Sequence, residues 1–256
     1  MKPIQDSGVF KWITESLTPP EGSGASYRLH VSGLIPSIFE KYAKILHRLD
    51  GHYKNVDQPL DPDELAILRL PDRSIVHDLV VRKRQSNIAP RVLWKDAACA
   101  LNLPFAPEIN HTWFGSRLRP YPEWPRFIHG PEEGILGIDE CGELVRLLGQ
   151  TNVEQSCFFR LAEIPFIATE QELLFSGTLN QVMPFFIEGG FQFTPEYWWP
   201  SDLSWCVCSG YDFDFTIVGG SSNLIESLLR SEILECIEVT PETRVDYLVP
   251  VPERDA

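Results

Sequence analysis

The stretch that decides the fold runs from Tyr197-Trp198-Trp199-Pro200-Ser201-Asp202 through Trp205-Cys206-Val207-Cys208 to Val218-Gly219-Gly220-Ser221. It holds three of the seven tryptophans of the 256-residue chain. Apolar and polar residues alternate over 205–210 and again over 212–217, which is typical of two strands. The glycine pair ends the second strand, and Ser221 or Ser222 stands where a helix N-cap belongs. A helix over 224–229 and an alternating strand over 233–239 complete a predicted β-β-α-β element.

Working outward toward the N-terminus, the second half of the chain carries one clear helix and two further strands. Asp139 is the expected N-cap of the helix and Gly149 its C-terminal stop, with an apolar stripe formed by Leu144, Val145, Leu147 and Leu148. The segments 157–161 and 182–187 read as strands. Pro184 places the second of them at a sheet edge, because proline cannot donate to a ladder.

The first half mixes helices, strands and an aromatic arm. We expect a short helix over 9–17, a strand over 27–31 and a helix over 94–101. Periodicity favours a helix over 38–49, although a strand from Tyr42 onward also fits. Residues 110–130, rich in aromatic side chains and proline, are expected to form an irregular arm packed on the core. Together the elements predict an α+β fold, with a mixed or antiparallel sheet and packed helices. We expect one domain over 1–256, with sub-lobes 1–128 and 129–256 as the alternative.

Composition and cysteine usage favour a cytoplasmic protein. No apolar run approaches the roughly 18 residues of a membrane span, and the first residues lack the apolar core of a signal peptide. The six cysteines are scattered, and the one close pair, Cys206 and Cys208, lacks further ligands of the kind zinc requires. Reduced, mostly buried thiols are therefore expected, and no cofactor or metal.

Charge is distributed unevenly between the two halves. Residues 1–128 carry 17 Lys and Arg against 14 Asp and Glu, whereas residues 129–256 carry 5 against 22, for a net charge of −14. An acidic surface repels phosphate backbones and lipid headgroups, so the pattern argues against nucleic-acid and membrane binding. The one basic cluster, Arg82-Lys83-Arg84, supplies too few phosphate contacts to change this. A basic protein partner is the partner that such a surface would attract, although simple solubility explains the charge as well.

Five residues are candidate binding residues. Asp212 and Asp214 are expected on one strand face, where two carboxylates would serve as a hard-metal ligand pair or as an acid/base pair. Trp198 and Trp199 cannot both point inward in a strand, so one of them is expected at the surface as a partner contact. Asp202 follows them in the adjoining turn. A solvated strand face and ordinary packing are the competing interpretations of these residues.

No catalytic signature accompanies these candidates. The six histidines have no nucleophile elbow or cysteine motif beside them, and His47 is interpreted as a hydrogen-bonded core residue. The turn Gly219-Gly220-Ser221-Ser222 would place free amides at a helix start, but it lacks a complete phosphate-binding pattern, and an ordinary capped turn is the simpler interpretation.

Two resemblances bear on the interpretation. The Tyr197–Asp202 segment, the Trp-Cys-Val strand and the Gly-Gly-Ser turn resemble a family of uncharacterised bacterial proteins, as does the segment 39–47. That resemblance implies a bacterial cytoplasmic protein and brings no activity with it. The acidic charge, the Leu34-Ile35-Pro36 entry and the aspartate-bearing hairpin are similar to SMI1/KNR4-like immunity and regulatory proteins, which are acidic α+β modules.

The sequence therefore predicts a non-enzymatic protein-binding module that uses an acidic C-terminal surface, as an immunity-type or regulatory protein would. The alternative is a small-molecule-binding protein or hydrolase with a cleft between the 110–130 arm and the 197–221 stretch. A histidine converging with Asp212 and Asp214 in a deep pocket would favour that alternative, and a filled face would count against it.

Overall fold

The computed structural model describes residues 1–4, 7–51, 91–118, 128–150, 153–161, 174–187 and 194–250. Contacts divide the chain into two compact units. Unit 1 comprises residues 1–47 and 132–246, and unit 2 comprises residues 48–131 and 247–256. All five candidate binding residues belong to unit 1, so its sheet decides how they are presented.

Unit 1 is built on an antiparallel sheet, which confirms the predicted α+β class. In spatial order its strands are β1 (Lys2–Ile4), β7 (Leu174–Thr178), β6 (Ser156–Arg160), β8 (Tyr197–Pro200), β9 (Cys206–Cys208), β10 (Phe215–Gly220), β2 (Lys41–Leu46) and β11 (Glu235–Val239). Along the chain β9 and β10 are followed by α7 (Ser222–Leu229) and β11, so the β-β-α-β element is confirmed. Strand β2, from the first half of the chain, lies between β10 and β11.

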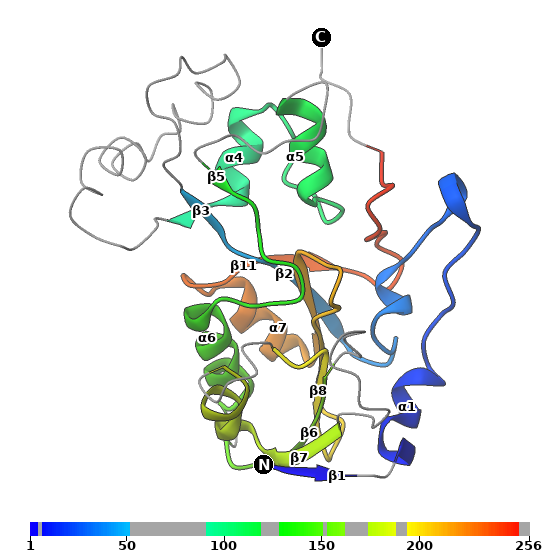
Figure 1. Ribbon diagram of the computed structural model, residues 1–256, viewed down its shortest axis with the longest axis vertical. Coiled ribbons are helices and arrows are strands. Elements are labelled where there is room, and N and C mark those ends of the chain that lie inside the picture. The colour runs from blue at the N-terminus through cyan, green and yellow to red at the C-terminus, as the bar shows by residue number, and fades with distance from the viewer. Residues whose placement is uncertain are drawn as a thin grey trace, which may run out of the picture. The chain divides into compact units, whose positions relative to one another are not determined.

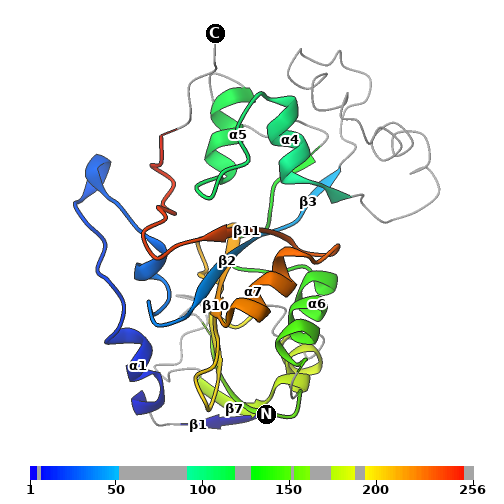
Figure 2. The ribbon, with the colours of Figure 1, turned by 180° about the vertical axis from the view of Figure 1, so that it is seen from behind.

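Helices α6 (Ile138–Leu148) and α7 lie on one side of this sheet (Figure 1, Figure 2). The sheet face toward them carries the main apolar core, in which Trp198 pairs across strands with Phe159 and Val207. The apolar stripe of α6 predicted from sequence is buried in this core. Burying this apolar face stabilises the fold by about 25 cal/mol for each Å² removed from water.

The opposite face of the sheet is also covered. A 3-10 turn (Ser7–Phe10) and α1 (Lys11–Thr14) bring aromatic rings onto it. The ring of Trp199 lies 5.7 Å from Phe10 and 5.7 Å from Phe158, centroid to centroid. The Tyr197 hydroxyl donates to the carbonyl of Leu34 at 3.0 Å, which satisfies its polar end within the core. Both faces of the central strands are therefore buried.

The described residues of unit 2 form a small sheet and two helices. Its strands are, in spatial order, β4 (Arg91–Val92), β3 (Leu49–Gly51) and β5 (Ile128–His129), and its helices are α4 (Trp94–Ala100) and α5 (His111–Leu118). Helix α4 confirms the helix predicted over 94–101. The irregular arm predicted over 110–130 is wrong for its first part, because Asn110 accepts a hydrogen bond from the backbone of Thr112 and α5 follows. Residues 119–127 of that arm lie outside the described residues.

The favoured helix over 38–49 is wrong, and the strand alternative from Tyr42 is correct. Residues 41–46 form β2, which has β10 on one side and β11 on the other. Strand β2 contains Lys41 and Lys44, three residues apart, and Lys44 is fully buried, so the polar spacing fits a helix as well as a strand. Ile38, which a helix would have buried, is 62% exposed.

Two predicted strands are also wrong. Residues 183–187 form a π-helical turn, because β7 ends at Thr178 and a 3-10 turn (Leu179–Gln181) leads the chain out of the sheet. Residues 27–31 form isolated bridges instead of a strand, with His30 bridging to Arg244. The cluster Arg82-Lys83-Arg84 lies outside the described residues.

The helix boundaries are confirmed in part. Gly149 ends α6 as expected, but Gly137 is its N-cap, and its backbone N–H donates to the carboxylate of Glu140 at 3.2 Å. Asp139 lies in the first turn, where its charge favours the positive helix terminus without capping it. The helix predicted over 9–17 is shorter and ends at Thr14.

Candidate functional site

Neither tryptophan of the 198–199 pair is exposed, which corrects the expectation that one of them lies at the surface. Both side chains are fully buried. The alternation rule holds, since they point to opposite faces of β8, but helices cover one face and the N-terminal aromatic rings cover the other. Trp198 and Trp199 therefore stabilise the core and offer no contact to a partner.

Asp212 and Asp214 do not share a strand face, so the predicted carboxylate pair is wrong. Strand β10 begins only at Phe215, and both aspartates lie in the turn between β9 and β10. Asp212 is exposed, whereas Asp214 is fully buried. Asp202 is exposed in the turn before β9, at the other end of that strand, where its carboxylate accepts from the backbone of Ser204 at 3.0 Å. The structure does not bring Asp202 together with the other two.

A buried chain of hydrogen bonds runs beside Asp214. His47 Nδ1 lies 2.8 Å from the carbonyl oxygen of Glu132, and His47 Nε2 lies 2.9 Å from Thr216 Oγ1. Ser209 Oγ lies 2.7 Å from the same Thr216 oxygen. A carbonyl only accepts, so Nδ1 carries the proton and Nε2 accepts from the threonine hydroxyl. Ser209 then donates to Thr216, which gives the whole chain one direction.

Burial controls the protonation of this histidine. Its side chain has no exposed surface, and burial lowers the pKa of His47 to about 4, against the opposing effects of the Glu132 carbonyl and the Asp214 charge. His47 is thus neutral at pH 7. This confirms the interpretation of His47 as a hydrogen-bonded core residue.

The threonine, the imidazole and the carbonyl have the distances of a nucleophile, a base and an orienting group. Thr216 is nevertheless fully buried and Ser209 is 2% exposed, so a substrate has no access to either hydroxyl in this conformation. The convergence of Asp214 with a histidine is therefore a filled core region. Its observed role is to tie three segments of the chain together.

Above this region two turns meet at the surface. The backbone N–H of Gly134 donates to the carbonyl of Phe213 at 2.8 Å, and a Cβ at Gly134 would lie 2.9 Å from the Cα of Tyr211. Gly134 also has φ +69°, so both the space and the backbone favour glycine. The close approach presents the acidic corner, which we define as Glu132, Glu133, Tyr211 and Asp212. The three carboxylates are exposed, and Tyr211 is 48% exposed.

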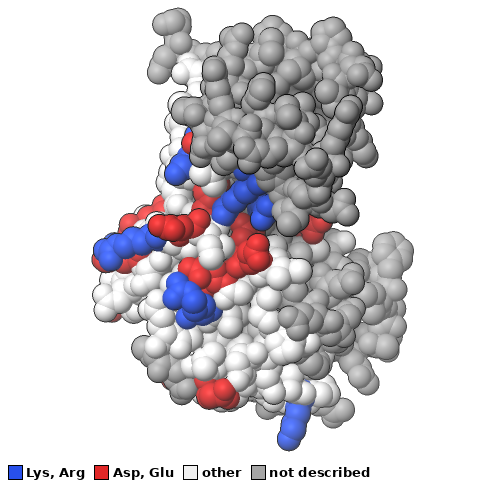
Figure 3. Space-filling model, turned by 90° about the vertical axis from the view of Figure 1, so that its left-hand side faces the viewer, with Lys and Arg blue, Asp and Glu red and all other residues white. Residues whose placement is uncertain are grey.

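The described arginines of the C-terminal half form ion pairs. Each of its described arginines pairs with a carboxylate of the same half: Arg146 with Glu143, Arg160 with Glu196, Arg230 with Glu226 and Arg244 with Asp246. Arg254 lies outside the described residues. On the face in Figure 3, acidic side chains gather across the middle with basic side chains among them. The carboxylates of this half outnumber its arginines, so a negative excess remains after pairing.

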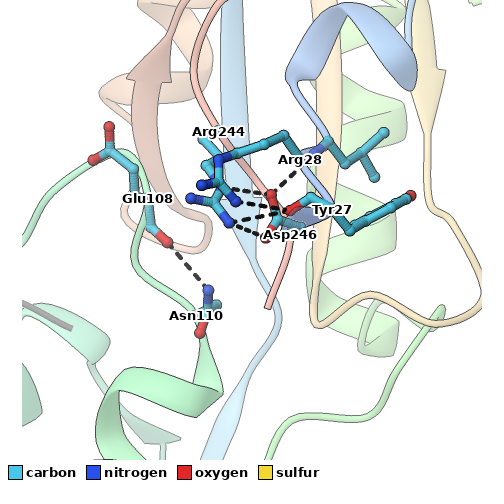
Figure 4. A network of polar contacts seen from close by, with 7 residues as sticks. Tyr27, Arg28, Glu108, Asn110, Arg244 and Asp246 are labelled. Carbon is cyan, nitrogen blue, oxygen red and sulfur yellow. Dashed lines mark hydrogen bonds and ion pairs between the residues drawn. The ribbon is translucent and has the colours of Figure 1, made fainter. Parts of the chain in front are cut away.

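One of these pairs forms a polar cluster in its own right (Figure 4). Arg244 donates twice to the carboxylate of Asp246, at 2.7 Å each, and its guanidinium also reaches the carbonyl of Tyr27 at 3.3 Å. The same carboxylate accepts from the backbone of Leu29 at 2.9 Å. Asp246 is buried, and its charge is balanced within the cluster. The cluster joins the 27–31 segment to the end of unit 1 and has the features of a structural tie.

The turn at the start of α7 is an ordinary capped turn, as interpreted from the sequence. Ser221 is the N-cap, and its hydroxyl accepts from the backbone of Leu224 at 3.3 Å. The carboxylate of Glu40 accepts from the backbone of Ser222 at 2.8 Å, which places an anion of the chain itself at the helix N-terminus. In the part of the chain that the structure describes, no group of three His, Cys, Asp or Glu is arranged to hold a metal ion.

The candidate residues that sequence reasoning missed are Glu132, Glu133 and Tyr211. No motif marks the two glutamates, and only the negative charge of the second half pointed toward them. Their proximity to the 211–213 turn follows from the path of the chain after β5, which local patterns do not encode.

The fold and the corner together define an α+β protein with an antiparallel sheet and an acidic surface region. Comparisons with protein-family models, with curated proteins and with solved structures found no match. Within the described ranges, no helix has the length and apolar character needed to cross a membrane.

Proposed function

We propose that this protein is a non-enzymatic binding module that engages a basic protein partner through its acidic C-terminal surface. The observation that carries the proposal is the acidic corner, where the segment of the exposed Glu132 and Glu133 approaches the turn of the exposed Asp212 and the half-exposed Tyr211. Tyrosine is enriched among residues that dominate binding energy, because it buries a large ring and retains a polar end. Carboxylates around it would steer a basic partner and fix its register.

The local structure supports a preorganised contact surface. Gly134 holds the 132–134 segment against the 211–213 turn through a backbone hydrogen bond. His47 also bonds to both segments, through the Glu132 carbonyl and through Asp214 and Thr216. A surface that is already ordered loses less conformational entropy on association than a mobile one.

The test measures association kinetics with a fluorescent lysine-rich peptide as the probe. Replacing the corner carboxylates (Glu132→Gln, Glu133→Gln, Asp212→Asn) should lower the association rate about tenfold at low salt and much less at high salt. The matched control removes three exposed charges elsewhere (Glu232→Gln, Glu242→Gln, Asp202→Asn) and should change the rate far less. Tyr211→Ala should raise the dissociation rate while leaving the association rate nearly unchanged.

Two outcomes would contradict the proposal. Equal losses in the corner variant and the control would mean that the probe responds to net charge and not to this surface. An association rate that does not depend on salt would remove the electrostatic basis altogether.

The alternative proposal is a small-molecule-binding protein or hydrolase near Asp212 and Asp214. The hydrogen-bond distances between Thr216, His47 and the Glu132 carbonyl favour it, whereas the complete burial of Thr216 and His47 counts against it. Hydrolysis of p-nitrophenyl acetate that is lost in Thr216→Val would support the hydrolase.

A further inference from the structure

One imidazole joins the three segments that underlie the acidic corner. His47 follows β2, its backbone N–H donates to the carbonyl of Asp214 at 2.9 Å, and its ring bonds to Glu132 and Thr216. Above it, Gly134 bonds to Phe213. Among the bonds described above, the ring is the titratable group, and its partners are a backbone carbonyl and a hydroxyl.

The direction of the chain depends on one proton. With Nε2 unprotonated, Thr216 donates to the ring and accepts from Ser209. A proton on Nε2 turns that nitrogen into a donor, so Thr216 must accept from the ring and turn its own hydrogen away. The hydrogen of Ser209 then loses its acceptor, and a positive charge stands in a site without exposed surface. Admission of water to the ring relieves both costs.

The segments that bond to His47, and the strands beside it, carry several charged residues. The 209–216 turn contributes Asp214 and Asp212, and the 132–134 segment contributes Glu132 and Glu133. Strand β2 contributes Lys44, whose ammonium lies over the ring of Phe215 at 4.4 Å, and β11 contributes the buried Glu235, which pairs with Leu46. The charge of Asp214 favours the protonated form of the ring, although burial has the larger effect.

We propose that His47 is a proton-operated clasp, by which we mean a switchable link between two segments. In its neutral form the ring holds the 132–134 segment against the 209–216 segment, and on protonation it releases it. Because burial lowers the pKa of His47 to about 4, the release is expected as the pH falls toward 4. The clasp belongs to the fold itself and does not depend on the identity of any partner. It goes beyond the proposed binding role, and its test uses the protein without a partner.

Hydrogen exchange of the Gly134 amide, followed by NMR on the full chain, tests the clasp. After correction for the intrinsic exchange rate, exchange of this amide should accelerate at least about tenfold between pH 6.5 and pH 4. The amide of Phe159, in the β6–β7–β8 ladder, serves as the internal control and should retain its protection. In His47→Gln, which has no titrating ring, exchange of the Gly134 amide should no longer depend on pH over this range.

The ring nitrogens provide a second measurement on the unmodified protein. Their ¹⁵N shifts should report the Nδ1–H tautomer at pH 7 and a protonation midpoint well below 6.5. A Gly134 amide that keeps its protection through the midpoint of the ring would overturn the proposal, as would a ring that titrates at its ordinary pH in the folded state. The proposal would also be overturned if the Gly134 amide of His47→Gln lost its protection in acid as that of the original protein does.

Discussion

At the scale of single residues, the chain uses its most reactive side chains for structure. His47 was interpreted from the sequence as a hydrogen-bonded core residue, and the structure confirms this. Its partners could not be predicted, because Thr216 and Glu132 are far away in sequence and local periodicity says nothing about such contacts. The adjacent tryptophans show the converse. Their opposite orientation followed from alternation, but their burial depended on a second covering layer that the pattern does not reveal.

The protonation of His47 predicts how stability depends on pH. The unfolded chain binds this proton near pH 6.5, whereas the folded protein binds it only near pH 4. The unfolded state therefore gains protons first, and the free energy of unfolding falls as the pH drops from 6.5 to 4. The loss due to this one group is about 3 kcal/mol. Urea denaturation at pH 7, 5.5 and 4 measures it.

The control for this prediction is His47→Gln. At pH 7 the variant should be less stable than the original protein by about 1–2 kcal/mol, because it loses hydrogen bonds in the core. Between pH 7 and pH 4 its stability should fall by about 3 kcal/mol less than that of the original protein. Parallel pH profiles for the two proteins would show that His47 does not titrate as its burial requires.

At the scale of elements, whether a helix or strand was predicted correctly depends on which of its faces are buried. The helices α6 and α7 were predicted because each has an apolar face, and α4 because its residues favour a helix. Strand β2 was predicted only as an alternative, because the buried Lys44 interrupts the apolar alternation that marks a strand. The 212–217 strand begins three residues later than predicted, since Asp212 and Asp214 belong to a turn and β10 extends through Gly220.

Two glycines in these elements should respond to alanine in opposite ways. A Cβ at Gly219 in β10 would lie 2.4 Å from the ring of Phe39 and 3.0 Å from that of Tyr42, so Gly219→Ala should cost about 1–3 kcal/mol. At Gly142 in α6 the nearest atom, on Met183, is 4.0 Å away. Gly142→Ala should therefore raise stability by about 0.5–1 kcal/mol. Urea unfolding of both variants measures these changes in the free energy of unfolding. A Gly142→Ala variant that is less stable than the original protein would contradict the prediction.

At the scale of the whole molecule, the sequence predicted the fold class and the charge of the protein better than it predicted where the candidate binding residues lie. The charge asymmetry, the absence of a recognisable catalytic motif and the α+β class were all evident from the sequence. The location of the acidic corner was not, because Glu132 and Glu133 meet the 211–213 turn only through the folded path of unit 1. Asp202, a candidate from sequence, lies in another turn at the far end of β9.

The six cysteines provide a measurement over both units. Cys99 is exposed and Cys236 is partly buried, whereas Cys141, Cys157, Cys206 and Cys208 are buried. Burial disfavours the thiolate and raises the pKa of Cys141 and of Cys157 to about 12. In native protein DTNB should therefore modify one thiol quickly and one slowly, with the other four reacting only in denaturant. Rapid reaction of more than two thiols without denaturant would contradict the buried arrangement.

The hydrogen bond between His47 and Glu132 also has a topological consequence. His47 is the last residue of unit 1 before the segment 48–131, and Glu132 is the first residue after it. The two ends of the segment are therefore joined by this hydrogen bond. For unit 1 the whole segment acts as one insertion between closely spaced ends, a site at which foreign sequence is tolerated in many proteins. Changes of length within 48–131 are therefore expected to leave the register of β2 with β10 and β11 intact.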